Sequence, residues 1–177
     1  MPGYLVPTNT VDQSTTVGGY NILSAVNAGA VLQVVNGTTT TQASTTTTEI
    51  DTNLTATITP SSTSSKILII TSQPIRVDNT ANTGYHEYAG IVSLYRGATL
   101  LMDHGTGGEE NEPGWHMSYS HSSFNYLDSP NTTSAVTYKT RMKTTVAPFT
   151  IYAQNNKNYT GTLTTPLGSI TLMEIAG

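Results

Sequence analysis

The stretch Met102–His121, MDHGTGGEENEPGWHMSYSH, gathers most of the histidines of the chain together with several carboxylates. Imidazole and carboxylate groups are ligands for zinc and other divalent metals, and oxygen ligands on a glycine-rich loop suit calcium. The spacing, however, matches neither the HExxH pattern of a zinc helix nor the alternating aspartates of a calcium loop. We therefore interpret the stretch as a solvated loop between strands, and we expect no metal and no cofactor.

Two sets of residues in this region have the types that catalysis uses. Glu109 and Glu112 could act as the paired carboxylates of a glycoside hydrolase. Ser123, His121 and Asp128 have the types of a hydrolytic triad, but no Gly-x-Ser-x-Gly turn surrounds the serine. Polysaccharide-degrading enzymes built on long β-helices need a repeat that this chain lacks. We expect no catalytic residues and no enzymatic activity.

Aromatic and acidic side chains of the same region are candidates for recognition. Exposed Trp and Tyr are typical of surfaces that bind sugars or proteins, and loops on a rigid scaffold often carry such functions. Trp115 could instead plug one end of the core, and for Phe124 we favour the core. The candidate recognition residues are Trp115, His116, Tyr119, Glu109, Glu110 and Glu112.

Charged residues make up only 10% of the chain, against about 25% in ordinary soluble domains. The net charge is −4 and no Lys/Arg cluster occurs, so we expect no nucleic-acid partner. Lys139, Arg141 and Lys143 share one face of a predicted strand and could meet acidic groups of a neighbouring subunit, or simply face solvent. An uncharged polar surface is typical of virion, adhesin and other extracellular β-proteins.

Cysteine is absent, which removes disulfides and thiolate chemistry. The first residues lack the basic start and apolar core of a signal peptide. The longest apolar runs, such as Lys66–Thr71, span only a few residues, which is too short to cross a bilayer. We therefore expect no membrane partner.

Alternation with a period of two dominates the chain after residue 30. Leu54–Ile58 places apolar residues on one face and threonines on the other, as in a half-buried strand. Ile67–Ile70 indicates a central strand buried on both faces, with Pro74 placing its far end at an edge or a bulge. Arg96-Gly97 marks a hairpin. Roughly eight such segments predict an all-β chain, an antiparallel β-sandwich of jelly-roll type.

The threonine-rich tract NGTTTTQASTTTTEID, residues 36–51, could be a stalk, a linker or a strand. Mucin-like stalks carry frequent proline and flexible linkers are rich in Gly and Ser, whereas this tract has no proline and one glycine. Threonine is β-branched and prefers extended backbone. We predict a β-segment with two polar faces, at a sheet edge or against a partner chain, with a turn near Gln42-Ala43-Ser44.

The first thirty residues lack clear alternation and contain Pro2, Pro7 and the pair Gly18-Gly19. We predict two parts: residues 1–30 as an extended N-terminal arm for attachment or assembly, and residues 31–177 as the β-sandwich domain. The arm is either disordered or ordered against a neighbouring subunit, and the sequence leaves both open.

Four stretches resemble one family: VLQVVNGTTTT (Val31–Thr41), LTATITPSSTSSKILIITSQ (Leu54–Gln73), YLDSPNTTSAVTYKTRM (Tyr126–Met142) and ITLMEIAG (Ile170–Gly177). They are similar to small virion proteins of tailed bacteriophages, common in phages of marine and freshwater bacteria and described as tail-fibre or capsid-associated. The resemblance covers residues 31–177 and carries no chemical signature. It implies a β-sandwich, a homotrimer, no enzymatic activity and a virion location after synthesis in the bacterial cytoplasm, where absent cysteine is expected.

Three functions are compatible with these observations. The first is a capsid-surface decoration protein, of cement or head-fibre type, whose partners are copies of itself and the major capsid protein. The alternative is a tail-fibre or receptor-binding tip that contacts tail proteins and recognises a host surface glycan. The third, which the sequence favours least, is a polysaccharide-degrading enzyme. One domain with a short arm favours decoration, because long tail fibres usually carry more shaft.

Overall fold

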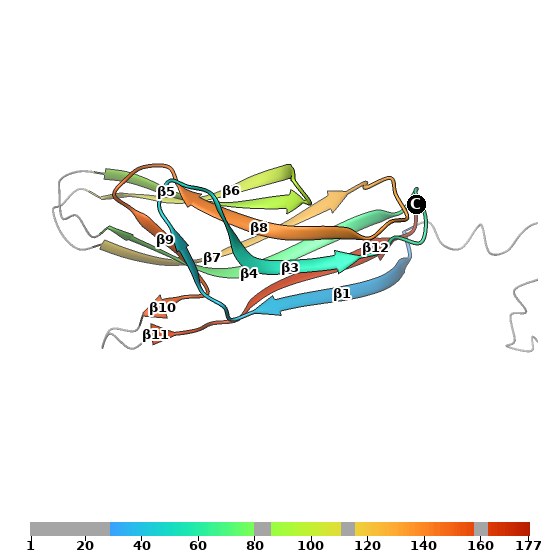
Figure 1. Ribbon diagram of the computed structural model, residues 1–177, viewed down its shortest axis with the longest axis horizontal. Coiled ribbons are helices and arrows are strands. Elements are labelled where there is room, and N and C mark those ends of the chain that lie inside the picture. The colour runs from blue at the N-terminus through green and yellow to red at the C-terminus, as the bar shows by residue number, and fades with distance from the viewer. Residues whose placement is uncertain (1–28, 80–85, 111–115, 158–162) are drawn as a thin grey trace, which may run out of the picture.

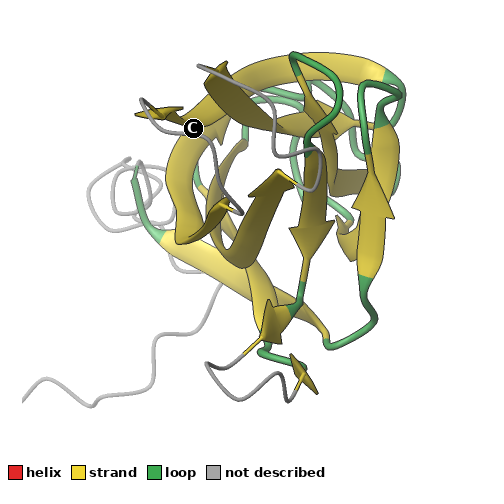
Figure 2. Ribbon diagram, turned by 90° about the vertical axis from the view of Figure 1, so that its left-hand side faces the viewer, coloured by secondary structure: helices red, strands yellow, loops and turns green. Residues whose placement is uncertain are grey.

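A computed structural model of the chain describes residues 29–79, 86–110, 116–157 and 163–177. Within these ranges the chain forms strands and turns but no helix (Figure 2), and hence no helix able to cross a membrane. The strands are β1 (Val31–Thr39), β2 (Ala43–Thr45), β3 (Ile50–Ile58), β4 (Lys66–Asn79), β5 (His86–Arg96), β6 (Thr99–Glu110), β7 (His116–Asp128), β8 (Val136–Thr144), β9 (Thr150–Ala153), β10 (Asn156–Lys157), β11 (Leu163–Thr164) and β12 (Gly168–Ile175).

The long strands form two antiparallel sheets. Sheet I has the order β1-β12-β4-β7, and sheet II has the order β3-β8-β5-β6. One edge of β4 pairs with β7, while its other edge pairs first with β12 and then with β9. β2 pairs with β9 and so extends sheet I, and β10 pairs with β11 in a separate small ribbon.

This strand order is that of a jelly roll. When the eight long strands are numbered along the chain, sheet I reads 1-8-3-6 and sheet II reads 2-7-4-5. That order is produced by two Greek keys folded into facing sheets. Figure 1 shows the two layers, elongated along the strand direction. The predicted fold class, an antiparallel β-sandwich of jelly-roll type, is confirmed.

Two hydrophobic clusters fill the space between the sheets. One includes Leu54, Ile69 and Tyr138, and the other includes Phe149 and Ile151. Phe124 packs against both clusters, which confirms its predicted place in the core. Burying one such apolar side chain stabilises the fold by about 1.5–3 kcal/mol, so these clusters hold the layers together.

Two local predictions are confirmed along the chain. β3 buries Thr52, Leu54, Ala56 and Ile58, and the residues between them are exposed. The Arg96-Gly97 signal marks the hairpin that joins β5 to β6. Gly97 adopts a φ of +58° there, a conformation that glycine reaches without strain.

The predictions for β4 need correction. Ile67 and Ile69 are buried, but Ile70 is 41% exposed, so the run is not buried on both faces. A sandwich sheet meets the core on one side only, and successive side chains point to opposite sides. Pro74 does not end the strand either, because β4 continues beyond it. It lies where β12 stops pairing with β4 and before β9 begins, which suits a residue without an amide hydrogen.

The threonine tract belongs to the folded body. Residues 36–39 end β1, residues 43–45 form β2, and residues 50–51 begin β3. β1 and β2 are the end strands of the path β1-β12-β4-β9-β2 through sheet I, which confirms the predicted edge position. The predicted turn near Gln42-Ala43-Ser44 is wrong: the bends fall at residues 46–48, where the Thr45 hydroxyl donates to the Thr48 carbonyl (2.6 Å).

The two ends of the sandwich are built differently (Figure 1). At the terminal end, Gly29 N donates to Ala176 O and Ala176 N donates to Ala30 O, each at 2.8 Å. At the opposite end, which we call the crossover end, β4 and β6 finish and β5 and β7 begin. Met102–His121, predicted as a loop, is mostly strand: it supplies β6 of sheet II and the start of β7 in sheet I.

Candidate functional site

The predicted recognition residues that the structure describes lie toward the crossover end. Glu109 and Glu110 are the last residues of β6, and His116 is the first residue of β7. They belong to different sheets, so the crossing between the layers brings these strand ends to one end of the molecule. Trp115 and Glu112 lie outside the described residues. In the described part of the chain, no three His, Asp or Glu side chains are grouped closely enough to hold a metal ion.

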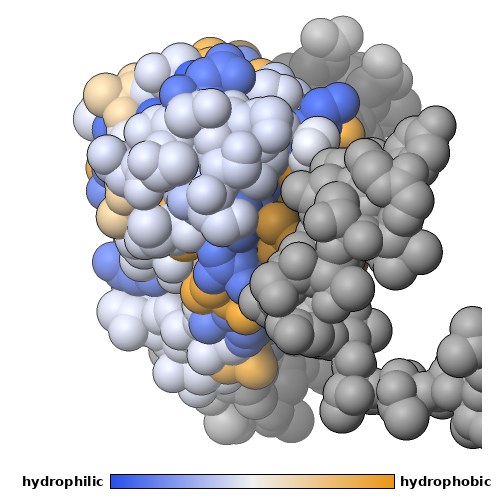
Figure 3. Space-filling view, turned by 90° about the vertical axis from the view of Figure 1, so that its right-hand side faces the viewer, coloured by the Kyte–Doolittle hydropathy of each residue, from blue (hydrophilic) through white to orange (hydrophobic). Residues whose placement is uncertain are grey.

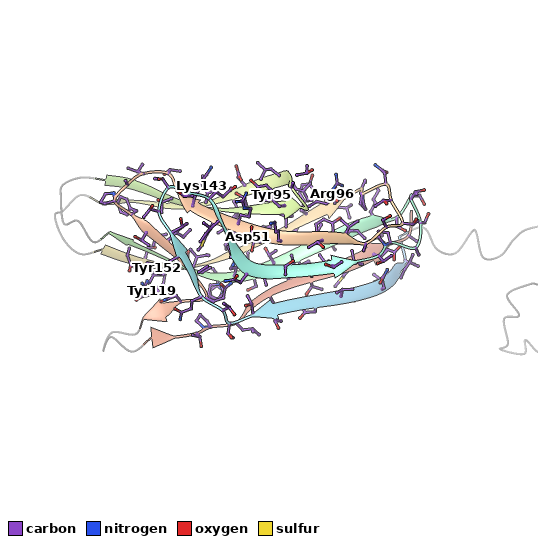
Figure 4. The ribbon with its side chains drawn as sticks, viewed as in Figure 1. Asp51, Tyr95, Arg96, Tyr119, Lys143 and Tyr152 are labelled. Carbon is purple, nitrogen blue, oxygen red and sulfur yellow. The ribbon has the colours of Figure 1, made fainter. Side chains whose placement is uncertain are left out.

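Tyr119 is the predicted recognition residue whose side chain the structure describes. It is 43% exposed on the outer side of β7, toward the crossover end (Figure 4). It borders a concavity of about 110 Å³, lined by Pro74, Ile75, Tyr119, Ser120, His121, Asn155 and Pro166. A phenol ring at such a rim suits a sugar ring or a protein side chain. The sequence did not point to Asn155 and Pro166, because they are far along the chain from the β4 and β7 residues that line the same concavity.

A buried arginine fixes one wall of this concavity. Arg76 lies opposite Tyr119 in the register of β4 and β7. Its Nη1 donates to Asn155 Oδ1 (2.9 Å), its Nη2 pairs with Asp78 Oδ2 (2.9 Å), and its guanidinium lies 4.0 Å from the Tyr152 ring centroid. Charge-assisted contacts of this kind hold the segment after β9 against sheet I.

Ser123, His121 and Asp128 do not form a triad. His121 and Asp128 are seven residues apart on β7, about 23 Å along an extended strand. His121 and Ser123 are exposed on the outer side, whereas Asp128 is buried on the inner side. Asp128 Oδ2 accepts from the Tyr138 hydroxyl (2.7 Å), and both of its oxygens accept from an arginine of β5, Arg96 (2.9 and 2.8 Å). Asp128 is thus a structural anchor.

The anchor has an electrostatic signature at Tyr138. Burial of the ring and the hydrogen bond to the Asp128 carboxylate raise the pKa of the Tyr138 phenol well above its usual range. The phenol therefore stays protonated and remains a donor to Asp128. Sequence reasoning missed this contact, since no local motif links the end of β7 to the middle of β8.

The outer face of sheet II carries a row of polar and charged residues. Asp51, Arg141, Ser93 and Asp103 follow one another in register across its four strands. Arg141 Nη1 pairs with Glu49 Oε2 (2.8 Å), and its Nε lies 3.1 Å from Asp51 Oδ1. Ser93 donates to Asp103 Oδ1 (2.6 Å). We call this set the charged face.

The sequence left open whether the basic stripe contacts a neighbouring subunit or faces solvent, and the charged face shows what two of its residues contact. Lys139 Nζ pairs with Asp51 Oδ2 (2.9 Å), so Lys139 and Arg141 both meet acidic groups of their own chain. The Tyr95 hydroxyl donates to Glu49 Oε2 (2.8 Å), and this bond and burial raise the pKa of the Tyr95 phenol. Figure 4 labels Asp51 and Tyr95 on this face. Both residues line an open depression of about 550 Å³. Lys139 and Arg141 thus pair with Asp51 and Glu49 within the chain.

The outer face of sheet I has the opposite chemistry. Val34, Met173, Leu68 and Leu127 form a row across its four strands, because their backbones are paired in register. Their chain neighbours Val35, Leu172, Ile67 and Tyr126 pack in the core, so this row points outward. We call the following residues the apolar face: Val31, Leu32, Val34, Leu68, Ile70, Leu127 and Met173. At the terminal end, Figure 3 shows small orange apolar patches among blue and pale polar surfaces.

Glu174 is, like Asp128, a carboxylate of sheet I that points inward. Glu174, next to Met173, is fully buried. Its Oε1 accepts from the Ser61 amide (2.7 Å) and hydroxyl (2.6 Å), and its Oε2 accepts from Gln33 Nε2 (2.6 Å). Burial alone would raise the pKa of Glu174, but these hydrogen bonds outweigh it and lower the pKa to about 2. Glu174 therefore ties the β3–β4 connection and β1 to β12.

No protein-family model and no curated protein sequence matches this chain. Solved structures similar to it include infectious bursal disease virus of the Gx strain (TM-score 0.34, 12% identity, 82% of this chain and 39% of that chain). They also include the T13 particle of this virus (0.34, 11%, 81% and 39%) and T=1 particles derived from it (0.34, 13%, 97% and 41%). This chain therefore spans about two fifths of those chains. At TM-scores below 0.5, the likeness carries no argument about function.

Proposed function

We propose that this chain is a non-enzymatic structural protein of a tailed-bacteriophage virion, acting as a decoration protein on the capsid surface. The observation that carries the proposal is the pair of edge strands β1 and β2, at the ends of the path β1-β12-β4-β9-β2, which contain no charged residue and no proline. Proteins that stay single usually protect such edges with charged residues or proline. Residues 34–48 contain neither. The edges are thus suited to pairing with a neighbouring chain.

Two further features support a structural role. Lys139 and Arg141 on the charged face pair with Asp51 and Glu49 of the same chain, which suits a surface that remains in solvent. The jelly roll serves in viral capsid and lectin domains alike, so it is compatible with a role in a particle. Together with the resemblance of residues 31–177 to phage virion proteins, these features favour a subunit of an assembly over an enzyme.

In this proposal the protein is a homotrimer fixed to the particle through residues 1–30. The start of β1 and the last strand meet at the terminal end, so this end would face the capsid. The crossover end would then point outward. Its partners are copies of itself and the major capsid protein.

Binding to purified capsids tests the proposal. The protein should bind heads that lack it, reach a saturating number of copies per head, and raise their resistance to heat or osmotic shock. A variant with Thr38→Lys and Ser44→Lys places charge on both edges and should assemble and bind poorly. Thr55→Lys and Thr57→Lys place the same charge on exposed positions of β3, the edge strand of sheet II, and form the matched control for the edges of sheet I. Failure of the unmodified protein to bind heads would exclude the decoration role.

A receptor-binding tip is the second candidate, and one observation favours it. Tyr119 is exposed beside the concavity on the outer side of sheet I, toward the crossover end and away from the terminal end. Such a protein should adsorb to host cells and block infection when added free, and Tyr119→Ala should weaken both effects. If heads bind the protein and cells do not, the tip role is wrong.

A further inference from the structure

The apolar face stands out among the exposed surfaces that the structure describes. Nine large hydrophobic side chains are exposed in the described residues, and five of them belong to this face: Val31, Leu32, Val34, Ile70 and Leu127. Three of these five lie on β1, one on β4 and one on β7, with Met173 of β12 between β1 and β4 in register. Of the other four, Tyr119 lies farther along β7, Leu100 lies in sheet II, and Val146 and Leu167 lie between strands. A contiguous apolar surface on a soluble protein marks a contact site.

The N-terminal segment, residues 1–28, joins the fold at the rim of this face. The bonds between Gly29, Ala30 and Ala176 fix the entry point beside the last strand. The next two residues, Val31 and Leu32, already belong to the apolar face. Gly29 adopts a φ of +84°, a left-handed conformation that lets the chain change direction at this point. A segment entering here can reach the face without crossing the rest of the fold.

The chemistry of the segment matches that of the face. Residues 1–28 contain one charged side chain, Asp12, and no Lys, Arg, His or Glu. Apolar residues gather near the junction, at Tyr20, Ile22, Leu23 and Val26. The row of Val31 includes Lys66, whereas the rows that contain Val34 and Ile70 carry no charged residue. Packing the segment on those two rows would therefore desolvate no ion. Apolar area removed from water contributes about 25 cal/mol per Å².

The segment is also long enough. Ile22 precedes Gly29 by seven residues, about 23 Å of extended chain. The four strands of sheet I are separated by three steps of about 4.8 Å, about 14 Å in all. Ile22 can therefore reach every strand of the face, whereas Val26, three residues before Gly29, reaches about 10 Å and only the strands nearest the entry point.

We propose that residues 20–26 pack on the apolar face of their own chain and cover Val34, Ile70 and Leu127. The inference concerns the free protein before any attachment, and it stands or falls independently of the proposed function. A second copy of the chain is the competing occupant, and the experiment below separates the two.

Hydrogen exchange read by mass spectrometry tests the proposal on the full chain. Backbone amides of residues 20–26 should exchange at least about tenfold more slowly than in a synthetic peptide of residues 1–28. The variant Val34→Thr/Ile70→Thr/Leu127→Thr should bring exchange within about threefold of the peptide, because the face loses its apolar character. The matched control is Leu100→Thr/Val146→Thr/Leu167→Thr, whose side chains are similarly exposed elsewhere, and it should leave the protection unchanged.

A second variant guards against a folding defect in the sandwich. Ile22→Ser/Leu23→Ser/Val26→Ser leaves the described strands untouched and should lose the same protection relative to its own peptide. Peptide-like exchange in the unmodified protein would overturn the proposal, as would equal loss of protection in the control. Protection that falls on dilution would assign the face to a second copy, and would overturn the intrachain contact.

Discussion

The outer faces of the two sheets are built on the same plan and carry opposite chemistry. On sheet II, one row places Asp51, Arg141, Ser93 and Asp103 across four strands. On sheet I, the corresponding row places Val34, Met173, Leu68 and Leu127 across four strands. Both rows point away from the core, so burial within the sandwich explains neither. The two faces differ in how much apolar surface each leaves exposed to water.

The charged face is complete as it stands. Lys139 and Arg141 pair with Asp51 and Glu49, Asp103 accepts from Ser93, and water covers the exposed groups at little cost. The apolar face keeps Val34 and Leu127 more than half exposed in the described structure. Exposed methylenes forgo about 0.8 kcal/mol each relative to burial. Sheet I is therefore the side of the molecule that gains from a further contact, and sheet II is not.

The largest effect we expect is the difference in the free energy of unfolding between substitutions on the inner and the outer side of sheet I. Ile69→Ala should lower the free energy of unfolding by about 2–5 kcal/mol, because it opens a cavity in a fully buried cluster. Ile70→Ala, one residue along the strand, should cost less than about 1 kcal/mol. Urea unfolding measures both. Equal losses would mean that Ile70 is as buried as its neighbour and that the two sides do not differ.

We expect an intermediate loss of stability at Glu174. Its side chain points into the sandwich, whereas that of its neighbour Met173 points outward. Glu174→Gln should cost about 1–3 kcal/mol at neutral pH, because an amide nitrogen then faces Gln33 Nε2 in place of an acceptor. The folded-state pKa of about 2 lies below the ordinary value of 4.5. Ionised Glu174 therefore adds stability above about pH 4.5, and this contribution is lost as the pH falls through about 2.

Urea midpoints across this acidic range provide the measurement. The unmodified protein should lose stability between about pH 4.5 and about pH 2, and Glu174→Gln should show a flatter curve over the same range. Parallel curves would show that another carboxylate is responsible for the acid sensitivity.

The smallest effect we expect is on sheet II. Arg141→Gln removes the contacts to Glu49 and Asp51 and should cost no more than about 1 kcal/mol, because the groups are partly exposed. The loss should shrink further in high salt, which screens surface charge. Urea unfolding at two ionic strengths measures it. A loss as large as that of Ile69→Ala would show that the charged face is part of what holds the sandwich together.

Local patterns predict the elements whose conformation is decided locally. The alternation of Leu54–Ile58 predicts a half-buried strand, and Arg96-Gly97 predicts a hairpin, because residues close in sequence decide both. The same logic places the threonine tract in strands, since β-branched residues without proline favour extended backbone. The edge position follows from its polar character on both faces.

Other features depend on pairing between strands that are far apart in the sequence, and local patterns do not predict them. The four apolar residues Ile67–Ile70 fit a strand covered on both sides, and only the layer order of the jelly roll exposes Ile70. Met102–His121 has the composition of a loop, yet it lies mostly in strands that pair with distant partners. The roles of Asp128 and Glu174 likewise depend on contacts with residues distant in the sequence, which no local motif predicts.

Carbene footprinting of the free, full-length protein compares the two outer faces most directly. Leu127 on sheet I and Leu100 on sheet II are 52% and 47% exposed in the described structure, so the described strands alone would let them react alike. If residues 20–26 cover the apolar face, Leu127 should be labelled several-fold more slowly than Leu100, and Ile22→Ser/Leu23→Ser/Val26→Ser should remove the difference. Equal labelling of Leu127 and Leu100 in the unmodified protein would contradict a covered apolar face.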